Sequence, residues 1–187
     1  MTPNLLTIAG SDPIGGAGVQ ADIKTIHALG GYAFSVLTAI NAQNFDGVQA
    51  VYPLPQTQVA DQLSALQNVP FDAIKIGQLA NAEIVESVAD YIATVSCPVI
   101  LDPVMISSSG RRLLEATAQP GLVTQLFPRV SLITPNIPEV NALLNTDYRG
   151  LESEMADIAQ GFAQLGVQAV LVKGGHSDEH QACDYLL

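Results

Sequence analysis

The sequence predicts an α/β protein whose strands are mostly parallel and buried. Three observations favour this class. Short apolar runs of strand length alternate with amphipathic stretches of helical period along the 187 residues. Glycines and small polar residues follow the apolar runs, as at the carboxyl ends of parallel strands. The chain also shows no internal repeat and no linker, so we expect a single domain over residues 1–187.

The first strand–loop–helix unit organises the rest of the chain. Residues 5–9 predict a buried strand, residues 10–16 a glycine-rich loop, and a helical pattern begins at Ala17 and ends at Gly30 and Gly31. Further strands are expected at residues 32–40, 48–52, 71–77, 98–101, 130–134 and 168–173, with a last one near 184–187. Helices are expected from Pro55, at residues 84–95, 116–127 and 138–144, and after Ser153 as a helix cap.

Composition excludes several classes of partner. The net charge is −11, with 7 basic residues against 18 acidic ones, and such a surface disfavours nucleic acids and anionic membranes. Cys97 and Cys183 lie far apart without histidines nearby, which disfavours zinc and suits a reducing compartment. We expect Cys97 to be a buried small hydrophobe. No signal peptide or membrane-length apolar run is present, so a cytoplasmic location is expected.

The glycine-rich loop has more than one interpretation. Gly16, Gly18 and Ala21 fit the dinucleotide pattern G-x-G-x-x-A, but several residues separate this pattern from the strand. The second strand also ends in amides rather than in a ribose-binding acid, so a dinucleotide oxidoreductase is a distant alternative. A simple connecting turn is a further interpretation, which the acids Asp12 and Asp22 weaken. An acid near a helix N-terminus can, however, have no role beyond a favourable interaction with the helix dipole.

Polar residues follow six of the predicted strands, and parallel strands would bring them to one edge of the sheet. Two acids and a lysine carry most of the chemistry. Asp102 and Glu139 suit a partly hydrated Mg²⁺ beside phosphates, and Lys173 before two glycines suits phosphate itself. Each also has a purely structural interpretation, as a turn residue, a first-turn acid and a strand-end lysine. The full set is Gly10, Ser11, Asp12, Gln43, Asn44, Gly77, Gln78, Asp102, Asn136, Glu139, Lys173, Gly174, Gly175 and His176, the last expected to be a loop residue.

Several short motifs, in order, resemble the hydroxymethylpyrimidine/phosphomethylpyrimidine kinases of thiamine biosynthesis, members of the ribokinase-like superfamily. The resemblance implies a three-layer α/β/α fold with a central, mostly parallel sheet. Pyridoxal kinases share this fold and part of the site and are the main alternative. The motifs are AGSD at 9–12, GGAGVQAD at 15–22, AQN at 42–44, KIG at 75–77, DPVM at 102–105, SG-x-RLL at 109–114, TPN-x-PE at 134–139 and VKGGH at 172–176.

The resemblance implies a role for each matched residue. Gln43 would read the aminopyrimidine edge of the substrate, since a carboxamide offers a donor and an acceptor side by side. Asp102 and Glu139 would organise Mg²⁺ through water. The γ-phosphoryl of ATP would pass to the hydroxymethyl oxygen and, in a second reaction, to the monophosphate. Lys173 is the candidate catalytic residue, and relatives suggest a homodimer. The pocket would be completed by Asp22, Gly10, Ala17, Gln78 and Val104, and the ATP phosphates would face Asn136, Lys173, Gly174 and Gly175.

The chain departs from the family pattern in two places. Gln78 stands where the family usually has a methionine against the pyrimidine ring. The chain also stops near residues 184–187, before the family's glycine-rich G-T-G-C turn, which cradles the transferred phosphoryl and supplies the residue nearest the nucleophile. The resemblance therefore implies that the C-terminal part of the fold is missing and that these residues alone have little or no kinase activity. A non-catalytic pyrimidine-binding protein is the alternative from a different class.

Overall fold

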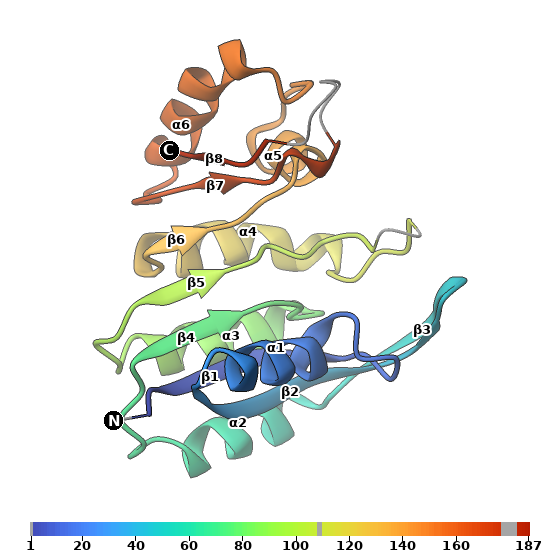
Figure 1. Cartoon of the computed structure of the whole chain (residues 1–187), viewed down its shortest axis with the longest axis vertical. Helices are drawn as coiled ribbons and strands as arrows, with labels where there is room; N and C mark the ends of the chain where they lie inside the picture. The colour runs from blue at the N-terminus through green and yellow to red at the C-terminus, as the bar shows by residue number, and fades with distance from the viewer. Residues whose placement is uncertain (1, 108–109, 177–182) are drawn as a thin grey trace.

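A central sheet of parallel strands runs through the molecule (Figure 1). The computed structural model describes residues 2–107, 110–176 and 183–187. Six strands pair in the order β3-β2-β1-β4-β5-β6, and each neighbouring pair is parallel except the antiparallel β2–β3 hairpin. The α/β class with a mostly parallel sheet is thereby confirmed. The strands are β1 (Asn4–Ser11), β2 (Tyr32–Asn44), β3 (Gly47–Pro53), β4 (Ala73–Ile76), β5 (Val99–Leu101) and β6 (Leu132–Ile133).

Two short strands extend the arrangement beyond β6. β7 (Leu171–Val172) is flanked by parallel bridges that join Val170 to Ile133 and Lys173 to Asn136. β8 (Tyr185–Leu186) pairs antiparallel with β7, at the position where the sequence predicts a last strand. The bridge between Asn136 and Lys173 therefore places Lys173 at the same edge of the sheet as the carboxyl ends of the other parallel strands.

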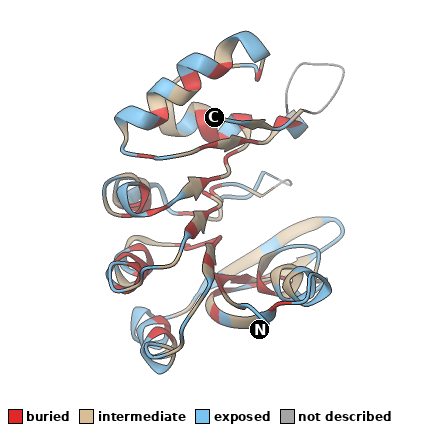
Figure 2. Cartoon of the chain, turned by 60° about the vertical axis from the view of Figure 1, so that its left-hand side comes forward, coloured by how far each residue is buried: buried red, intermediate tan, exposed pale blue. Residues whose placement is uncertain are grey.

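Helices cover both faces of the sheet, which gives the expected three layers. α1 (Gly18–Ala28) lies on one face, against β1 and β2, and α2 (Gln56–Ala65) and α3 (Ala82–Ile92) lie on the other (Figures 1 and 2). α5 (Ile137–Leu144) and α6 (Met155–Gln164) pack together beside β7.

The helix expected at 116–127 is present but irregular. Residues 116–129 form a 3₁₀ turn, then α4 (Gln119–Gly121), a π-helical turn (Leu122–Leu126) and a second 3₁₀ turn (Phe127–Arg129). Pro120 and Pro128 lack the backbone N–H that a continuous α-helix needs, which accounts for the changes of helix type.

The core lies where these layers meet. Strand residues that alternate toward the helices are fully buried, as are the facing helix residues (Figure 2). The largest buried rings are Phe127 and Phe162, whose centroids lie 6.3 Å apart. The apolar strand side chains with no exposed surface include Leu6, Ile8, Val36, Ile74, Ile76, Leu101 and Ile133.

The structure corrects three local predictions. β2 continues to Asn44 because its end pairs with β3, so Gln43 lies on the strand and not after it. Ser153 does not cap α6: the carboxylate of Glu154 instead accepts hydrogen bonds of 2.9–3.0 Å from three backbone N–H groups at 149–151. Cys97 is half-buried rather than fully buried, and its partial burial raises the pKa of its thiol.

A cap that the sequence analysis missed begins α3. The side chain of Asn81 accepts a hydrogen bond of 3.0 Å from the backbone N–H of Ile84. We expect Asn81→Ala to lower the free energy of unfolding by about 1 kcal/mol, because one helix N–H loses its partner. Urea denaturation measures this change. The exposed Asn68, changed to Ala, is the control, for which a shift within about 0.5 kcal/mol is expected. Equal effects of the two substitutions would contradict the capping role.

Candidate functional site

A groove lies over the carboxyl ends of the parallel strands. It consists of a cavity of about 560 Å³ and a smaller one of about 290 Å³. They adjoin, because both are lined by Ala17, Gln43, Asp102, Val104 and Leu113. The larger cavity extends to Asn136, Glu139 and Lys173, and the smaller one to Asp22, Asn41, Lys75 and Gln78.

The loop after β1 is held by Asp12, which is only 2% exposed. Its carboxylate accepts hydrogen bonds from the backbone N–H groups of Ile14, Gly16 and Ala17, at 3.0, 2.9 and 2.8 Å. The protein's own carboxylate therefore occupies the amides that a dinucleotide pyrophosphate would need, and the loop does not support that alternative. Asp12 acts as an anchor that places Ala17 in the groove.

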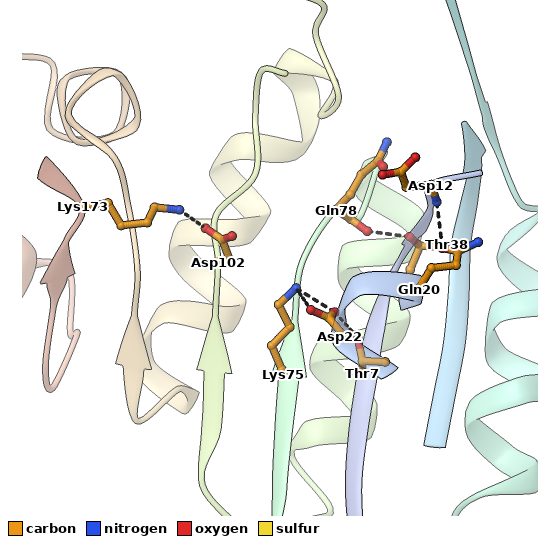
Figure 3. A network of polar contacts seen from close by, with 9 residues as sticks. All are labelled: Thr7, Asp12, Gln20, Asp22, Thr38, Lys75, Gln78, Asp102 and Lys173. Carbon is orange, nitrogen blue, oxygen red and sulfur yellow. Dashed lines mark hydrogen bonds and ion pairs between the residues drawn. The ribbon is translucent and has the colours of Figure 1, made fainter. Parts of the chain in front are cut away.

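A charged cluster forms one wall of the smaller cavity. The carboxylate of Asp22 accepts hydrogen bonds from Lys75 Nζ, at 2.8 and 3.1 Å, and from Thr7 Oγ1, at 2.6 Å (Figure 3). Sequence reasoning missed Lys75 and Thr7 as partners of Asp22. A lysine in the middle of an otherwise apolar strand was the available signal, because lysines are rarely buried without a partner.

A second ion pair lies at the other end of the groove. Lys173 Nζ is 2.7 Å from Asp102 Oδ1, and Figure 3 shows the two side chains pointing toward each other from neighbouring parts of the sheet. The main chain places Lys173, since its N–H donates to Pro135 O at 2.9 Å. Both side chains keep partial exposure, 36% and 26%, so the pair can exchange partners with a ligand.

Glu139 is the most perturbed acid of the site. Its side chain forms a capping box at the start of α5: Glu139 Oε2 accepts from the Asn136 N–H, and Asn136 Oδ1 accepts from the Glu139 N–H, both at 2.9 Å. Glu139 is only 5% exposed. Burial raises the pKa of its carboxyl to about 7, against the opposing effects of the Asn136 hydrogen bond and the charge of Lys173.

The donor set fits a magnesium ion that keeps several waters. Among residues 2–107, 110–176 and 183–187, no three His, Cys, Asp or Glu side chains cluster as a complete metal cage. Asp102 and Glu139 instead supply two carboxylates in the larger cavity. Oxygen donors of this small number suit Mg²⁺, which is usually held by one or two carboxylates, water and substrate phosphates. A nearby cation would also favour ionisation of the buried Glu139.

The two glycines after Lys173 differ from each other. Gly174 is buried, its N–H donates to Asp184 Oδ1 at 3.0 Å, and a Cβ there would lie 2.0 Å from Cys183 O. Close approach of the chain before β8 thus explains this glycine. Gly175 is exposed and has open space around its Cα. Ser108 and Ser109 of the preceding polar loop, and the side chain of His176, lie outside the described residues.

The structure brings most of the predicted site residues into one groove. Gly10 lies beneath it, where a Cβ would meet Gln78 Oε1 at 2.2 Å. Gly174 and Gly175 are not among the residues that line either cavity. Those that line the groove are Asp12, Ala17, Asp22, Gln43, Asn44, Gly77, Gln78, Asp102, Val104, Asn136, Glu139 and Lys173.

Fold and groove together define a ribokinase-like α/β protein. The model of the phosphomethylpyrimidine kinase family matches residues 12–187, and the chain belongs to this family. The hydroxymethylpyrimidine/phosphomethylpyrimidine kinase of Escherichia coli K12 is 49% identical over 185 residues, which cover 98% of this chain and 70% of that protein.

Solved structures agree with this assignment. A phosphomethylpyrimidine kinase from Clostridium difficile 630 superposes with a TM-score of 0.90 at 40% identity, covering all of this chain and 80% of the other. The pyridoxal kinase of Staphylococcus aureus, in complex with ADP, gives a TM-score of 0.89 at 30% identity, covering all of this chain and 69% of the other. Within the described residues, no helix has the length and apolarity to cross a membrane.

The raised pKa of Glu139 predicts a pH-dependent stability. Between pH 4.5 and about 7 this carboxyl ionises in the unfolded chain but stays protonated in the folded one. The free energy of unfolding should therefore fall as the pH rises through this window, by about 3 kcal/mol, and the loss should be complete above pH 7. Glu139→Gln should remove this part of the fall.

Urea denaturation at several pH values, without added divalent cations, measures the free energy of unfolding of the original protein and of Glu139→Gln. The contribution of Glu139 is the difference between the two pH profiles. The exposed Glu86, changed to Gln, is the control and should leave the pH dependence as it is. Parallel curves for the original protein and Glu139→Gln would refute the assignment.

Proposed function

We propose that the groove binds 4-amino-5-hydroxymethyl-2-methylpyrimidine and its monophosphate and serves their ATP-dependent phosphorylation in thiamine biosynthesis. One observation carries the proposal. A carboxamide suited to an aminopyrimidine, Gln43, lines the same cavity as Lys173, Asp102 and Glu139, a set suited to phosphate and Mg²⁺. Membership of the phosphomethylpyrimidine kinase family supports the substrate class.

At the pyrimidine end, the side chains bind and orient the ring. Gln43 pairs with the aminopyrimidine edge, and Ala17 and Val104 contact the ring as apolar walls. Asp22 lines the smaller cavity and presents carboxylate oxygens that accept hydrogen bonds. Its orientation is set by Lys75 and Thr7, which occupy both carboxylate oxygens. Orientation of this kind keeps the hydroxymethyl oxygen directed toward the phosphate end.

At the phosphate end, Lys173 releases Asp102 and binds phosphate oxygens of ATP, assisted by Asn136 at the start of α5. Gly175, which is exposed with open space around it, can approach those phosphates, whereas Gly174 is placed by its contact with Cys183. Asp102 and Glu139 would hold Mg²⁺ through water, and the ion, when bound, neutralises phosphate charge. Phosphoryl transfer depends mainly on positioning and charge neutralisation. In this chain the ammonium group of Lys173 supplies the positive charge that neutralises the phosphate oxygens.

A second candidate substrate is pyridoxal. The likeness to the Staphylococcus aureus pyridoxal kinase, at 30% identity and a TM-score of 0.89, favours keeping it as the alternative. We also propose that the 187 residues alone turn over slowly, because none of them matches the family's G-T-G-C turn. Binding is therefore a sharper test of the site than turnover.

Calorimetric titration with the hydroxymethylpyrimidine tests the pyrimidine end. We expect binding to this chain that is weakened at least about tenfold in Gln43→Ala, because a directional pair of hydrogen bonds is lost. Gln58→Ala on the exposed side of α2 is the control and should bind as the original protein does. Tighter binding of pyridoxal than of the pyrimidine would select the alternative substrate.

Titration with ATP in the presence of Mg²⁺ tests the phosphate end. Lys173→Met should weaken nucleotide binding by roughly tenfold, because a charge-assisted contact to phosphate is lost, while pyrimidine binding stays within about twofold. The exposed Arg149, changed to Met, removes the same charge away from the groove and should have no effect. Unchanged ATP affinity in Lys173→Met would remove this residue from the nucleotide site.

A further inference from the structure

Two carboxamides pair with each other inside the smaller cavity. Asn41 on β2 and Gln78 after β4 are 7% and 6% exposed, and both line this cavity. Asn41 Nδ2 donates to Gln78 Oε1 at 2.7 Å. In return, Gln78 Nε2 donates to Asn41 Oδ1 at 3.3 Å and to Leu113 O at 3.4 Å. One short bond therefore fixes the carbonyl end of Gln78, whereas its amide nitrogen is held by two long, weak ones.

The surrounding chain fixes where Gln78 lies. Thr38 Oγ1 donates to the backbone carbonyl of Gln78 at 2.5 Å (Figure 3). A Cβ at Gly10 would lie 2.2 Å from Gln78 Oε1 and 3.1 Å from Asn41 Nδ2, so only glycine leaves room for the pair. The carbonyl end of Gln78 thus packs against β1. Its amide end reaches toward Leu113, which lines both cavities.

The pair keeps hydrogen-bonding capacity that an apolar wall would lack. In the described part of the chain, the bonds above use one of the two Nδ2 hydrogens of Asn41 and leave Gln78 Nε2 with long bonds only. A ligand atom that accepts a hydrogen bond can replace one of these long bonds with a shorter one. An alkyl group cannot, and it would confine a weakly bonded polar group away from water.

The proposed function sets the direction of the ligand, and this inference rests on it. The phosphate end of the groove lies at Lys173, which is bridged to Asn136 past β6, and at its partner Asp102 at the end of β5, whereas Asn41 and Gln78 lie on the β2 and β4 side of the sheet. A pyrimidine whose 5-hydroxymethyl group points to the phosphate end directs its opposite ring atom, C2, toward the amide pair. The substituent at C2 is therefore the group that Gln78 contacts.

We propose that Gln78 is a specificity-determining residue that favours a hydrogen-bond acceptor on the C2 substituent, and that Asn41 is its positioning residue. The preferred substrate class is then a 4-amino-5-hydroxymethylpyrimidine that carries an alkoxy or hydroxyalkyl group at C2, bound in preference to an alkyl group of the same shape.

Two isosteric ligands test this proposal. The 2-methoxy and 2-ethyl forms of 4-amino-5-hydroxymethylpyrimidine differ only by an oxygen in place of a methylene. We expect the chain to bind the methoxy form about tenfold more tightly in calorimetric titration, because the methoxy oxygen gains one neutral hydrogen bond from the positioned amide of Gln78. The double variant Asn41→Val with Gln78→Met, whose apolar side chains can pack together, should lower this ratio at least fivefold.

Single variants and a control separate specificity from folding. Asn41→Val alone should lower the methoxy-to-ethyl ratio at least threefold, because Gln78 then loses its short bond, and this variant decides the matter if the double variant does not fold. Gln62→Met on α2 removes a carboxamide that bonds to Leu37 and Gln58, away from the groove. It should leave the ratio unchanged even where it lowers the thermal midpoint.

The outcomes are distinguishable from failure of the proposed function. Binding of both pyrimidines with the same ratio in the original protein and in both Asn41→Val variants would overturn the specificity role and leave the proposed function intact. If the original protein binds the 2-methyl pyrimidine but neither the methoxy nor the ethyl form, the specificity role is overturned and the proposed function stands. If it binds none of the three, both are overturned. A ratio that falls in the variants and not in Gln62→Met would establish the amide pair as the reader of the C2 substituent.

Discussion

The parallel alignment of the strands is the constraint on which the site depends. β1 pairs in parallel with β2 and β4, and the same direction continues through β5 and β6 to β7. All their carboxyl ends therefore open at one edge, and residues as distant in sequence as Asp102 and Lys173 come within 2.7 Å. Helices on both faces bury the strands, so the edge is the part of the sheet where polar side chains can gather.

Two ion pairs divide this edge between two kinds of task. The chain has only seven Lys and Arg residues and a net charge of −11, yet two of its lysines lie in the groove. Lys75 is held by both oxygens of Asp22, beside Thr7, an arrangement that fixes a carboxylate. Lys173 has one acid partner, keeps partial exposure and lies beside the buried Glu139. The first pair orients a wall of the cavity, whereas the second is the one that, under the proposed function, would exchange partners with a phosphate.

Close packing around β1 limits what the small cavity can hold. Gly18 has φ +58° and a Cβ there would lie 2.3 Å from Gly10 O, so the start of α1 approaches β1 as closely as a glycine allows. Gly10 in turn leaves room for the amides of Asn41 and Gln78. Asp12 completes the arrangement by holding the loop amides. A substitution at any of these positions changes the shape of the cavity through its neighbours.

Local sequence patterns determined the class of fold, the succession of strands and helices along the chain, and the positions at which chemistry could occur. This worked because buried parallel strands are continuous apolar runs, and because glycines and polar residues mark the points where such strands end. Short-range capping was less predictable: Glu154, not Ser153, holds the turn before α6. Several side chains can reach the same backbone amides, and only their geometry selects one.

Only the tertiary structure decided which polar residues are partners. Lys75 with Asp22 are 53 residues apart, Asn41 with Gln78 are 37 apart and Lys173 with Asp102 are 71 apart. Pairing across such distances depends on strand order and register, which no local pattern encodes. The same is true of Gly174, which reads as a phosphate-binding glycine in the sequence but is required by the approach of Cys183. The sequence by itself determined which residue types lie at the sheet edge, and three-dimensional packing decided what each one contacts.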